Sequence, residues 1–596
     1  MTDESHDDHF GEPPAPPGVF DPSTQEFRAI RPEDEEEVER IETARESIGM
    51  FETGEFMAIP APVPARPFEP PEWDEGNKPR GRGGRLARST AFFSLATSAS
   101  RIAGLVREVF AASYFGVKGP MSAFTIAFQV PNLVRSLFAD AAIQAAFVPV
   151  FTEQLEKGNK KEAFRLASTL LFAVTMVLGA ITAIFILAAP VIMPIFAPGF
   201  EGEIKHLTIV LSQILFPILI MLGATGMVVG VLNSYDRFAA FAISPFFWNV
   251  AIIVVLVLLA PHFHGDNKIY AYAIGVLVGT AIQLAIPAWD IRHTPFRFKF
   301  EFAWTKEVRR VLLLMLPVTI SLGLINFNLL INSFFGTLVS DEAPAAIDKA
   351  FRIYMLPQGI FSVAVSTVVF PTLARFAARG AYDDLRRTMA NGMRMIVLLL
   401  VPAAASILVL STPMIRLVYQ RGEFDAAQTH LVAIALFWFA FSLPFNGLFL
   451  LQTRTFFSLQ RPWIPTAISG GNLVITALVA LALYSSAGIG GIVAATAIAT
   501  AASVAAQALV LRRHLGGIEL GRFIDTALRV LFASAILAGV SYLIWSGLDS
   551  ALGRSLLAQA ISMTAALSAG AAVYLGAAKA LRIPEIDQLI NVVRRR

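Results

Sequence analysis

Two arginines lie within the first long apolar segment of the chain, at Arg101 and Arg107, and Glu108 follows directly. A charged side chain at the centre of a bilayer costs about 2.5–3.5 kcal/mol on insertion scales. Such residues are retained where they face a polar cavity or a partner. Because a guanidinium offers planar, paired donors that suit phosphate oxygens, we expect a membrane transporter with a cationic internal cavity and an anionic cargo.

Later apolar segments carry further charges, Arg135 and Asp140 in the second and Arg352 in the eighth. We expect Glu108 and Asp140 to hold the arginines in place and to limit the positive charge of an empty site. Purely structural alternatives stay open. Arg101 and Glu108 share one helix face and could neutralise each other, and Arg135 could reach the membrane interface.

Arg352 has its own alternative, because Asp348 and Lys349 lie one turn earlier. Part of this group could be a solvated helix end. The aromatic run Phe246–Trp248 is expected to pack or to face lipid.

Apolar helices must position these residues. The chain has 596 residues, of which 55% are hydrophobic and 16% charged, whereas a soluble protein carries about 25% charged residues. Apolar stretches of about 20 residues, each able to cross a bilayer core of about 30 Å, follow one another from about residue 90. We therefore expect an all-α polytopic membrane protein of about fourteen transmembrane helices. The expected spans are 90–116, 121–152, 163–190, 205–233, 239–261, 269–291, 308–338, 345–376, 384–411, 428–453, 463–485, 488–513, 522–546 and 555–580.

Basic residues favour one orientation of these spans. A cluster from Lys78 to Arg88 precedes the first span, and Arg594, Arg595 and Arg596 close the chain. Alternate loops between the spans are also basic, whereas the others carry few lysines or arginines. The positive-inside rule then places both termini in the cytoplasm.

The first 85 or so residues differ from the rest. They combine proline-rich tracts with the acidic run Glu33–Glu37, a composition typical of a disordered tail. A docking motif for cell-wall or division proteins is an alternative. A nucleic-acid-binding reading of Arg80–Arg85 is disfavoured, because this segment adjoins a membrane edge where topology or anionic lipid explains it.

Other chemistries find no support. The chain has no cysteine, so disulfides and thiolate sites are excluded. It has no P-loop, and its histidines lack metalloprotease spacing. His262 and His264 are expected to be ordinary loop residues, and Gly488–Gly491 a tight turn between spans. We predict neither an enzyme nor a bound cofactor or metal.

Several blocks of sequence together resemble the MurJ/MviN family, whose members flip lipid II, the undecaprenyl-pyrophosphate precursor of peptidoglycan, across the bacterial inner membrane. The blocks are Ser100–Glu108, Phe128–Pro149, Arg352–Pro371, Tyr419–Phe424 and Leu450–Leu459. The resemblance covers nearly everything from about residue 85 to 580.

The resemblance implies two six-helix lobes around a cavity, as in the related multidrug/oligosaccharidyl-lipid/polysaccharide exporters, and two last helices that form a groove for the lipid tail. The implied divisions are 1–85 for the tail, 86–291 for the N-lobe, 292–310 for a basic linker, 311–514 for the C-lobe and 515–596 for the last two helices and the basic C-terminus. It places substrate-binding arginines at Arg101, Arg107 and Arg352, with Arg135 and Asp140 at the second-span positions.

The chain departs from the family pattern at several positions. Glu108, Ser122 and Phe351 stand where Asp is common, and Leu450 where some members have lysine. A family sodium site uses a carboxylate in the eleventh span, where this chain offers Asn472 and Thr476; sodium coupling stays open.

We expect this protein to move lipid II to the outer leaflet of the bacterial cytoplasmic membrane by alternating access, with membrane lipids around it and no nucleic-acid partner. Two alternatives are kept: an exporter of drugs or of another polyprenyl-linked oligosaccharide, and a non-transporting scaffold that acts through the tail.

Overall fold

The computed structural model describes residues 18–21, 26–29, 82–138, 140–299 and 303–586. The chain divides into two compact units, residues 1–81 and 82–596. In the first unit, strands β1 (Gly18–Asp21) and β2 (Glu26–Ala29) pair antiparallel, with Gly18 opposite Ala29. Residues 82–85, which were expected to end the disordered tail, are helical instead. The remaining residues of that tail, including Lys78 and Arg80, lie outside the described residues.

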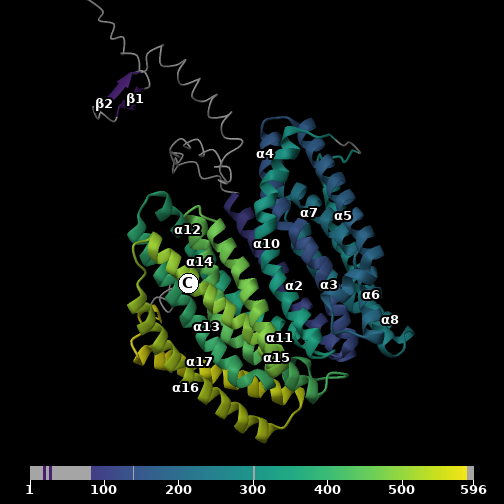
Figure 1. Cartoon of the computed structure of the whole chain (residues 1–596), viewed down its shortest axis with the longest axis vertical. Helices are drawn as coiled ribbons and strands as arrows, with labels where there is room; N and C mark the ends of the chain where they lie inside the picture. The colour runs from purple at the N-terminus through teal and green to yellow at the C-terminus, as the bar shows by residue number, and fades with distance from the viewer. Residues whose placement is uncertain (1–17, 22–25, 30–81, 139, 300–302, 587–596) are drawn as a thin grey trace, which may run out of the picture. The chain divides into compact units, whose positions relative to one another are not determined.

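The second unit is helical throughout its described length (Figure 1). Its first helices are α2 (Arg82–Phe115), α3 (Gly119–Phe138), α4 (Asp140–Glu156), α5 (Lys160–Phe196), α6 (Gly202–Leu215), α7 (Ile218–Ser234), α8 (Ala239–Leu259), α9 (Ile269–Asp290) and α10 (Lys306–Val339). The later helices are α11 (Ala343–Pro357), the π-helical turn η4 (Gln358–Ser362), α12 (Val363–Ala378), α13 (Tyr382–Tyr419), α14 (Ala426–Ser458), α15 (Trp463–His514), α16 (Leu520–Leu552) and α17 (Leu556–Ala580).

Each expected span coincides with helix, which confirms the all-helical membrane fold. Ten helical segments in the described part of the chain are long and apolar enough to cross a membrane. This criterion passes over α2, the α3–α4 pair and α10, and it takes α15 as one segment. The count of fourteen therefore stays a prediction.

Several helices are interrupted where the local sequence disfavours regular geometry. The expected eighth span is divided by η4, which follows directly on Pro357. The ring of proline cannot continue the regular hydrogen-bond ladder, and neighbouring helices can satisfy the freed carbonyl. In α15, Gly488 adopts φ 54° and ψ −137°, so the expected turn between the eleventh and twelfth spans is a sharp kink that glycine permits.

The helices of the second unit form two groups. Helices α2 to α9 pack mainly among themselves, as do α11 to α17, drawn in green to yellow in Figure 1. The α10 helix packs against α3 and α4 of the first group and against α15 of the second. The last two helices pair with each other, and α16 also lies along α13. The charged residues predicted on α2 and on α11 therefore belong to different groups and can meet only at the boundary between them.

Candidate functional site: a buried cationic cluster

Glu108 of α2 is the centre of a buried ionic cluster that joins the two groups of helices. Its Oε2 accepts a hydrogen bond from Lys349 Nζ at 2.6 Å and lies 3.2 Å from Arg352 Nε. Its Oε1 accepts a short hydrogen bond from the neighbouring Arg107. Lys349 and Arg352 belong to α11, so the Glu108 carboxylate links α2 to α11. Glu108 and Lys349 are 241 residues apart in the chain.

Helix geometry explains why these side chains converge. Asp348 and Arg352 are one turn apart on α11, and Asp348 Oδ2 accepts from Arg352 Nε at 2.9 Å. Lys349 is next to Asp348 and reaches α2 from the same turn. The backbone of α11 is held to α3 nearby, where Ser122 Oγ accepts from Ala345 N at 3.1 Å. Ser122 stands where the family commonly has Asp. Its hydroxyl thus anchors α11, the helix that carries Lys349 and Arg352.

Aromatic residues enclose the cluster. The Arg107 guanidinium lies over the Trp248 ring, 4.6 Å from its centroid, and Trp248 Nε1 donates to Thr280 Oγ1 at 3.1 Å. Lys349 Nζ lies 5.7 Å from the ring centroid of the buried Tyr419. Facing an aromatic ring partly replaces the hydration that a buried cation loses. The prediction that Trp248 serves only packing or lipid contact was incomplete.

The members of the cluster differ in exposure. Lys349 is fully buried, and Arg107 and Glu108 are nearly so. The Arg352 side chain keeps 37% of its surface exposed. The alternative that this part of α11 is a solvated helix end is wrong for Asp348 and Lys349, since both are buried. Arg352 is thus the member best placed to meet a ligand.

The cluster carries a net positive charge. Three cations, Arg107, Lys349 and Arg352, face two carboxylates, Glu108 and Asp348. The Nε atom of Arg107 is buried and has no acceptor among the described residues. Buried donors are normally paired, so this atom is an exception within the cluster. The exposed part of Arg352 is the part of the cluster that can bind an anion directly.

Arg101 lies apart from the ionic contacts of the cluster. Its side chain is exposed, and its Nη1 would be 4.0 Å from a Cβ added to Gly359 in η4. A second exposed guanidinium from α2 therefore lies beside the turn that follows α11. Glu108 pairs with Arg107 and the α11 cations. The alternative in which Arg101 and Glu108 neutralise each other is therefore wrong.

Arg135 and Asp140 were the two charged residues expected in the second span. Arg135 lies in the last turn of α3, and its Nε donates to Asn132 Oδ1 at 3.0 Å. The side chain of Asp140, at the start of α4, lies outside the described side chains. Their roles in substrate binding stay predictions.

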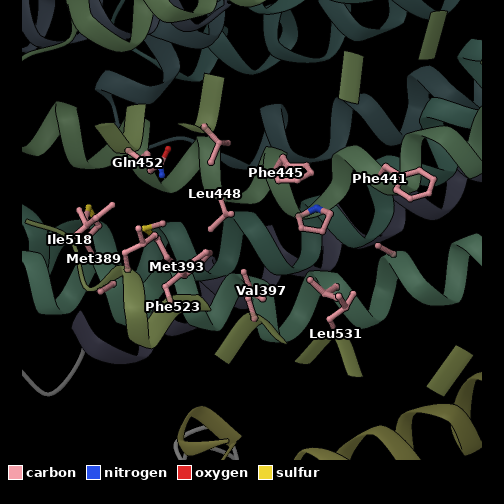
Figure 2. Close-up of a pocket in the computed structure, with 18 of the residues that line it drawn as sticks. Met389, Met393, Val397, Phe441, Phe445, Leu448, Gln452, Ile518, Phe523 and Leu531 are labelled. Carbon is pink, nitrogen blue, oxygen red and sulfur yellow. The ribbon is translucent and has the colours of Figure 1, made fainter. Parts of the chain in front are cut away.

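An apolar cavity of about 450 Å³ lies among α13, α14 and α16 (Figure 2). Met389, Met393 and Val397 of α13 face Phe445 and Leu448 of α14 across it. From α16, Phe523 and Leu531 complete the wall. Of the two last helices that were expected to form a groove for the lipid tail, only α16 contributes to this lining.

The two groups of helices are also joined at the ends of α2 and α13. Lys118 Nζ contacts Glu423 Oε2 at 2.6 Å, and the Glu423 amide donates to Ser113 O at 2.9 Å. The Val117 amide donates to Gln428 Oε1 at 3.0 Å. The hydrogen bond from Lys118, together with its charge, holds the pKa of Glu423 below its usual range. These contacts join the two groups on the side that the sequence predicts to be the outer one.

Together these features define a multi-pass helical membrane protein with a buried cationic site between two groups of helices. A sequence model of the family described as "Lipid II flippase MurJ" matches residues 111–573. The probable lipid II flippase MurJ of Rhizobium meliloti is 31% identical over 522 residues, covering 86% of this chain and 96% of that protein. The chain belongs to the MurJ family.

Solved structures agree at the level of the fold. A lipid II flippase MurJ in an inward closed conformation has a TM-score of 0.68 at 24% identity, covering 82% of this chain and 97% of that one. An inward-facing multidrug resistance transporter of the MATE family, from the MOP superfamily, has a TM-score of 0.60 at 13% identity and covers 70% of this chain and 94% of that one. The fold of this chain is thus similar to those of a MurJ flippase and of a MATE-family transporter.

Proposed function

We propose that this protein flips lipid II from the cytoplasmic to the outer leaflet of the bacterial inner membrane by alternating access, with both termini in the cytoplasm. The observation that carries the proposal is the cluster around Glu108, in which three cations from two helix groups meet a single shared carboxylate. A net positive site within a membrane fits an anionic head group and disfavours a cationic drug.

The pyrophosphate of lipid II is the part that this site would bind. Arg352 is half-exposed and Arg101 is exposed beside η4, so two guanidinium groups can approach the phosphate oxygens from α11 and from α2. Arg107 and Lys349 are buried and would not contact the phosphate directly. They would position Glu108 and keep the charge of the site positive. When pyrophosphate binds, Arg352 can exchange its contact with Glu108 for phosphate without leaving the carboxylate unpaired.

The polyprenyl tail requires an apolar surface, and the cavity among α13, α14 and α16 offers one. Its phenylalanine, methionine and leucine side chains favour a hydrocarbon chain. The head group and the tail would thus be held by different helices of the later group.

Transport needs no covalent step, so we propose that the protein is not an enzyme. The contacts of Lys118 and Glu423 would open, and the opposite side would close, as the head group passes outward. The membrane potential can assist by acting on the charges of the site, at about 2.3 kcal/mol per charge per 100 mV. The lobe boundaries predicted from the sequence are part of this proposal, with α10 contacting both lobes.

The test is complementation of a bacterium depleted of its own lipid II flippase, with membrane levels of each variant measured. We expect the wild type, a chain lacking residues 1–80 and Arg379→Ala to rescue growth, since Arg379 is exposed at the end of α12. Arg352→Ala and Arg107→Ala should fail at normal membrane levels.

Failure of the wild type, or full rescue by Arg352→Ala, would overturn the cargo assignment in favour of another exporter activity. If only the truncated chain fails, residues 1–80 carry the function, as a scaffold that recruits cell-wall or division proteins would require.

A further inference from the structure

A second cavity, of about 360 Å³, lies between α10 and the later helix group and is not explained by phosphate or tail binding. It is lined by side chains of α10, α11, η4, α14 and α15. Its size is within the range of small-molecule sites, roughly 300–1,000 Å³.

The polar groups that line this cavity are all uncharged. Asn328, Asn332, Asn446 and Asn472 supply amide groups, and the remaining polar lining residues carry hydroxyl or amide groups. An amide both donates and accepts, so such a surface matches hydroxyl and N-acetyl groups. A purely anionic ligand would find no counter-charge among the described lining residues.

One wall of the cavity is aromatic. The ring of Tyr354 stacks on that of Phe439 with centroids 5.2 Å apart, and Phe351 lies 5.7 Å from each of them. Flat apolar faces beside convergent amides are suited to a sugar ring, which has an apolar C–H face and a polar rim of hydroxyl groups.

The polar groups of the cavity are partly satisfied and partly free. Asn446 Nδ2 donates to Tyr354 Oη at 2.6 Å, and Asn328 Nδ2 donates to Asn472 Oδ1 at 3.0 Å. In contrast, Oε1 of Gln358 is buried and has no partner among the described residues. Gln358 begins η4, a π-helical turn of the kind that frequently occurs at functional sites. The amides of the cavity are thus held in place, and the Gln358 side chain, which lines the cavity, can offer its unpaired acceptor to a ligand once it turns toward the open space.

The cavity adjoins the cationic cluster along α11. Phe351 precedes Arg352, Met355 lies one turn further on, and Gln358 is about 9 Å along the helix axis from Arg352 at 1.5 Å per residue. Arg101 lies beside Gly359, the residue after Gln358. In lipid II the first sugar is bonded directly to the pyrophosphate, so a phosphate at Arg352 brings the sugars to the mouth of this cavity.

We propose that this cavity is a saccharide subsite that receives an N-acetylated sugar ring of the head group, with Gln358 accepting a hydrogen bond from it. The inference rests on the proposed function, because the pyrophosphate at Arg352 presents the sugar. The subsite distinguishes a glycosylated lipid from a bare polyprenyl pyrophosphate, which the cationic cluster alone cannot do.

The experiment measures dissociation constants of the purified protein for undecaprenyl pyrophosphate, for lipid II and for a lipid II analogue without its peptide. Gln358→Met removes the vacant acceptor at similar volume. Met355→Trp fills the mouth of the cavity at a position that is 42% exposed and should tolerate the larger side chain. Gln507→Met is the matched control, because Gln507 is also buried with an unpaired Oε1 but lines neither cavity.

We expect Gln358→Met and Met355→Trp to weaken binding of both glycosylated lipids at least tenfold and to leave undecaprenyl pyrophosphate binding unchanged. Gln507→Met should leave binding of all three lipids unchanged. Unchanged lipid II binding in folded forms of both variants would overturn the subsite, as would a loss seen only when the peptide is present. If the wild type binds none of the three lipids, the proposed function itself fails.

Discussion

Replacing Glu108 by glutamine should lower the free energy of unfolding by about 3–5 kcal/mol, the usual consequence of removing one partner from a buried ionic group. The change leaves Lys349 as a fully buried ammonium without its carboxylate, which it contacts at 2.6 Å. Arg352 loses less stabilisation in this variant, because it keeps its ion pair with Asp348 at 2.9 Å and is partly exposed to solvent.

The assay is thermal unfolding of the purified protein in detergent. The entropy of unfolding is roughly 2 cal/mol/K per residue, or about 1 kcal/mol/K for the unit spanning 82–596. Glu108→Gln should therefore lower Tm by about 3–5 °C. Lys349→Met alone should cost about 1.5–3 kcal/mol, the worth of one charge-assisted hydrogen bond, since Glu108 keeps two arginines.

The double variant separates this reasoning from a general loss of packing. Glu108→Gln combined with Lys349→Met removes the carboxylate and the stranded ammonium together and preserves the net charge of the cluster. Its Tm should exceed that of Glu108→Gln alone. A single variant that unfolds at the wild-type temperature, or a double variant whose loss equals the sum of the single losses, would refute the account of the cluster given above.

Three further predictions concern other parts of the structure. Because the hydrogen bond from Lys118 lowers the pKa of Glu423, their contact should stabilise the closed side above the ordinary carboxyl pKa and weaken as pH falls through the lowered value; carboxyl NMR of labelled glutamate should show that pKa returning to normal in Lys118→Met. Gly199→Ala should lower Tm by about 1–3 °C, since its Cβ would lie 1.9 Å from a backbone oxygen of α10, whereas Gly576→Ala, with open space around it, should leave Tm unchanged. Arg101→Ala should alter stability by less than about 0.5 kcal/mol because the side chain is exposed, yet weaken binding of undecaprenyl pyrophosphate to the purified protein.

Hydropathy was sufficient to locate the helices, because a bilayer requires long apolar segments with satisfied backbones. The glycine-rich stretch at Gly488 also marked the kink in α15, but the sequence did not show which prolines interrupt a helix. The π-helical turn at Gln358 follows Pro357, but the same residue types also occur inside continuous helix, as Pro402 does in α13. Whether a proline interrupts a helix depends on the packing of its neighbours, which one sequence does not reveal.

The site was predicted in part for a similar reason. Arginines in an apolar segment are conspicuous, so Arg107 and Arg352 were identified. Lys349 was missed because a lysine near the start of a helix usually faces water, and its carboxylate partner is distant in sequence. Single residues such as Asn446 and Gln358 give no local signal, since a cavity exists only once five elements have packed together.

A backbone hydrogen bond joins the two helix groups on the predicted outer side, and its breakage would report opening of the protein there. The Glu423 amide donates to Ser113 O at 2.9 Å, from the loop after α13 to the last turn of α2. Any state in which this loop moves away from the end of α2 must expose the Glu423 amide to water. The rate of hydrogen–deuterium exchange at this amide therefore measures the population of the opened conformer without a probe attached to the protein. Ligands that favour opening should increase exchange at this amide, while amides within the helices stay protected.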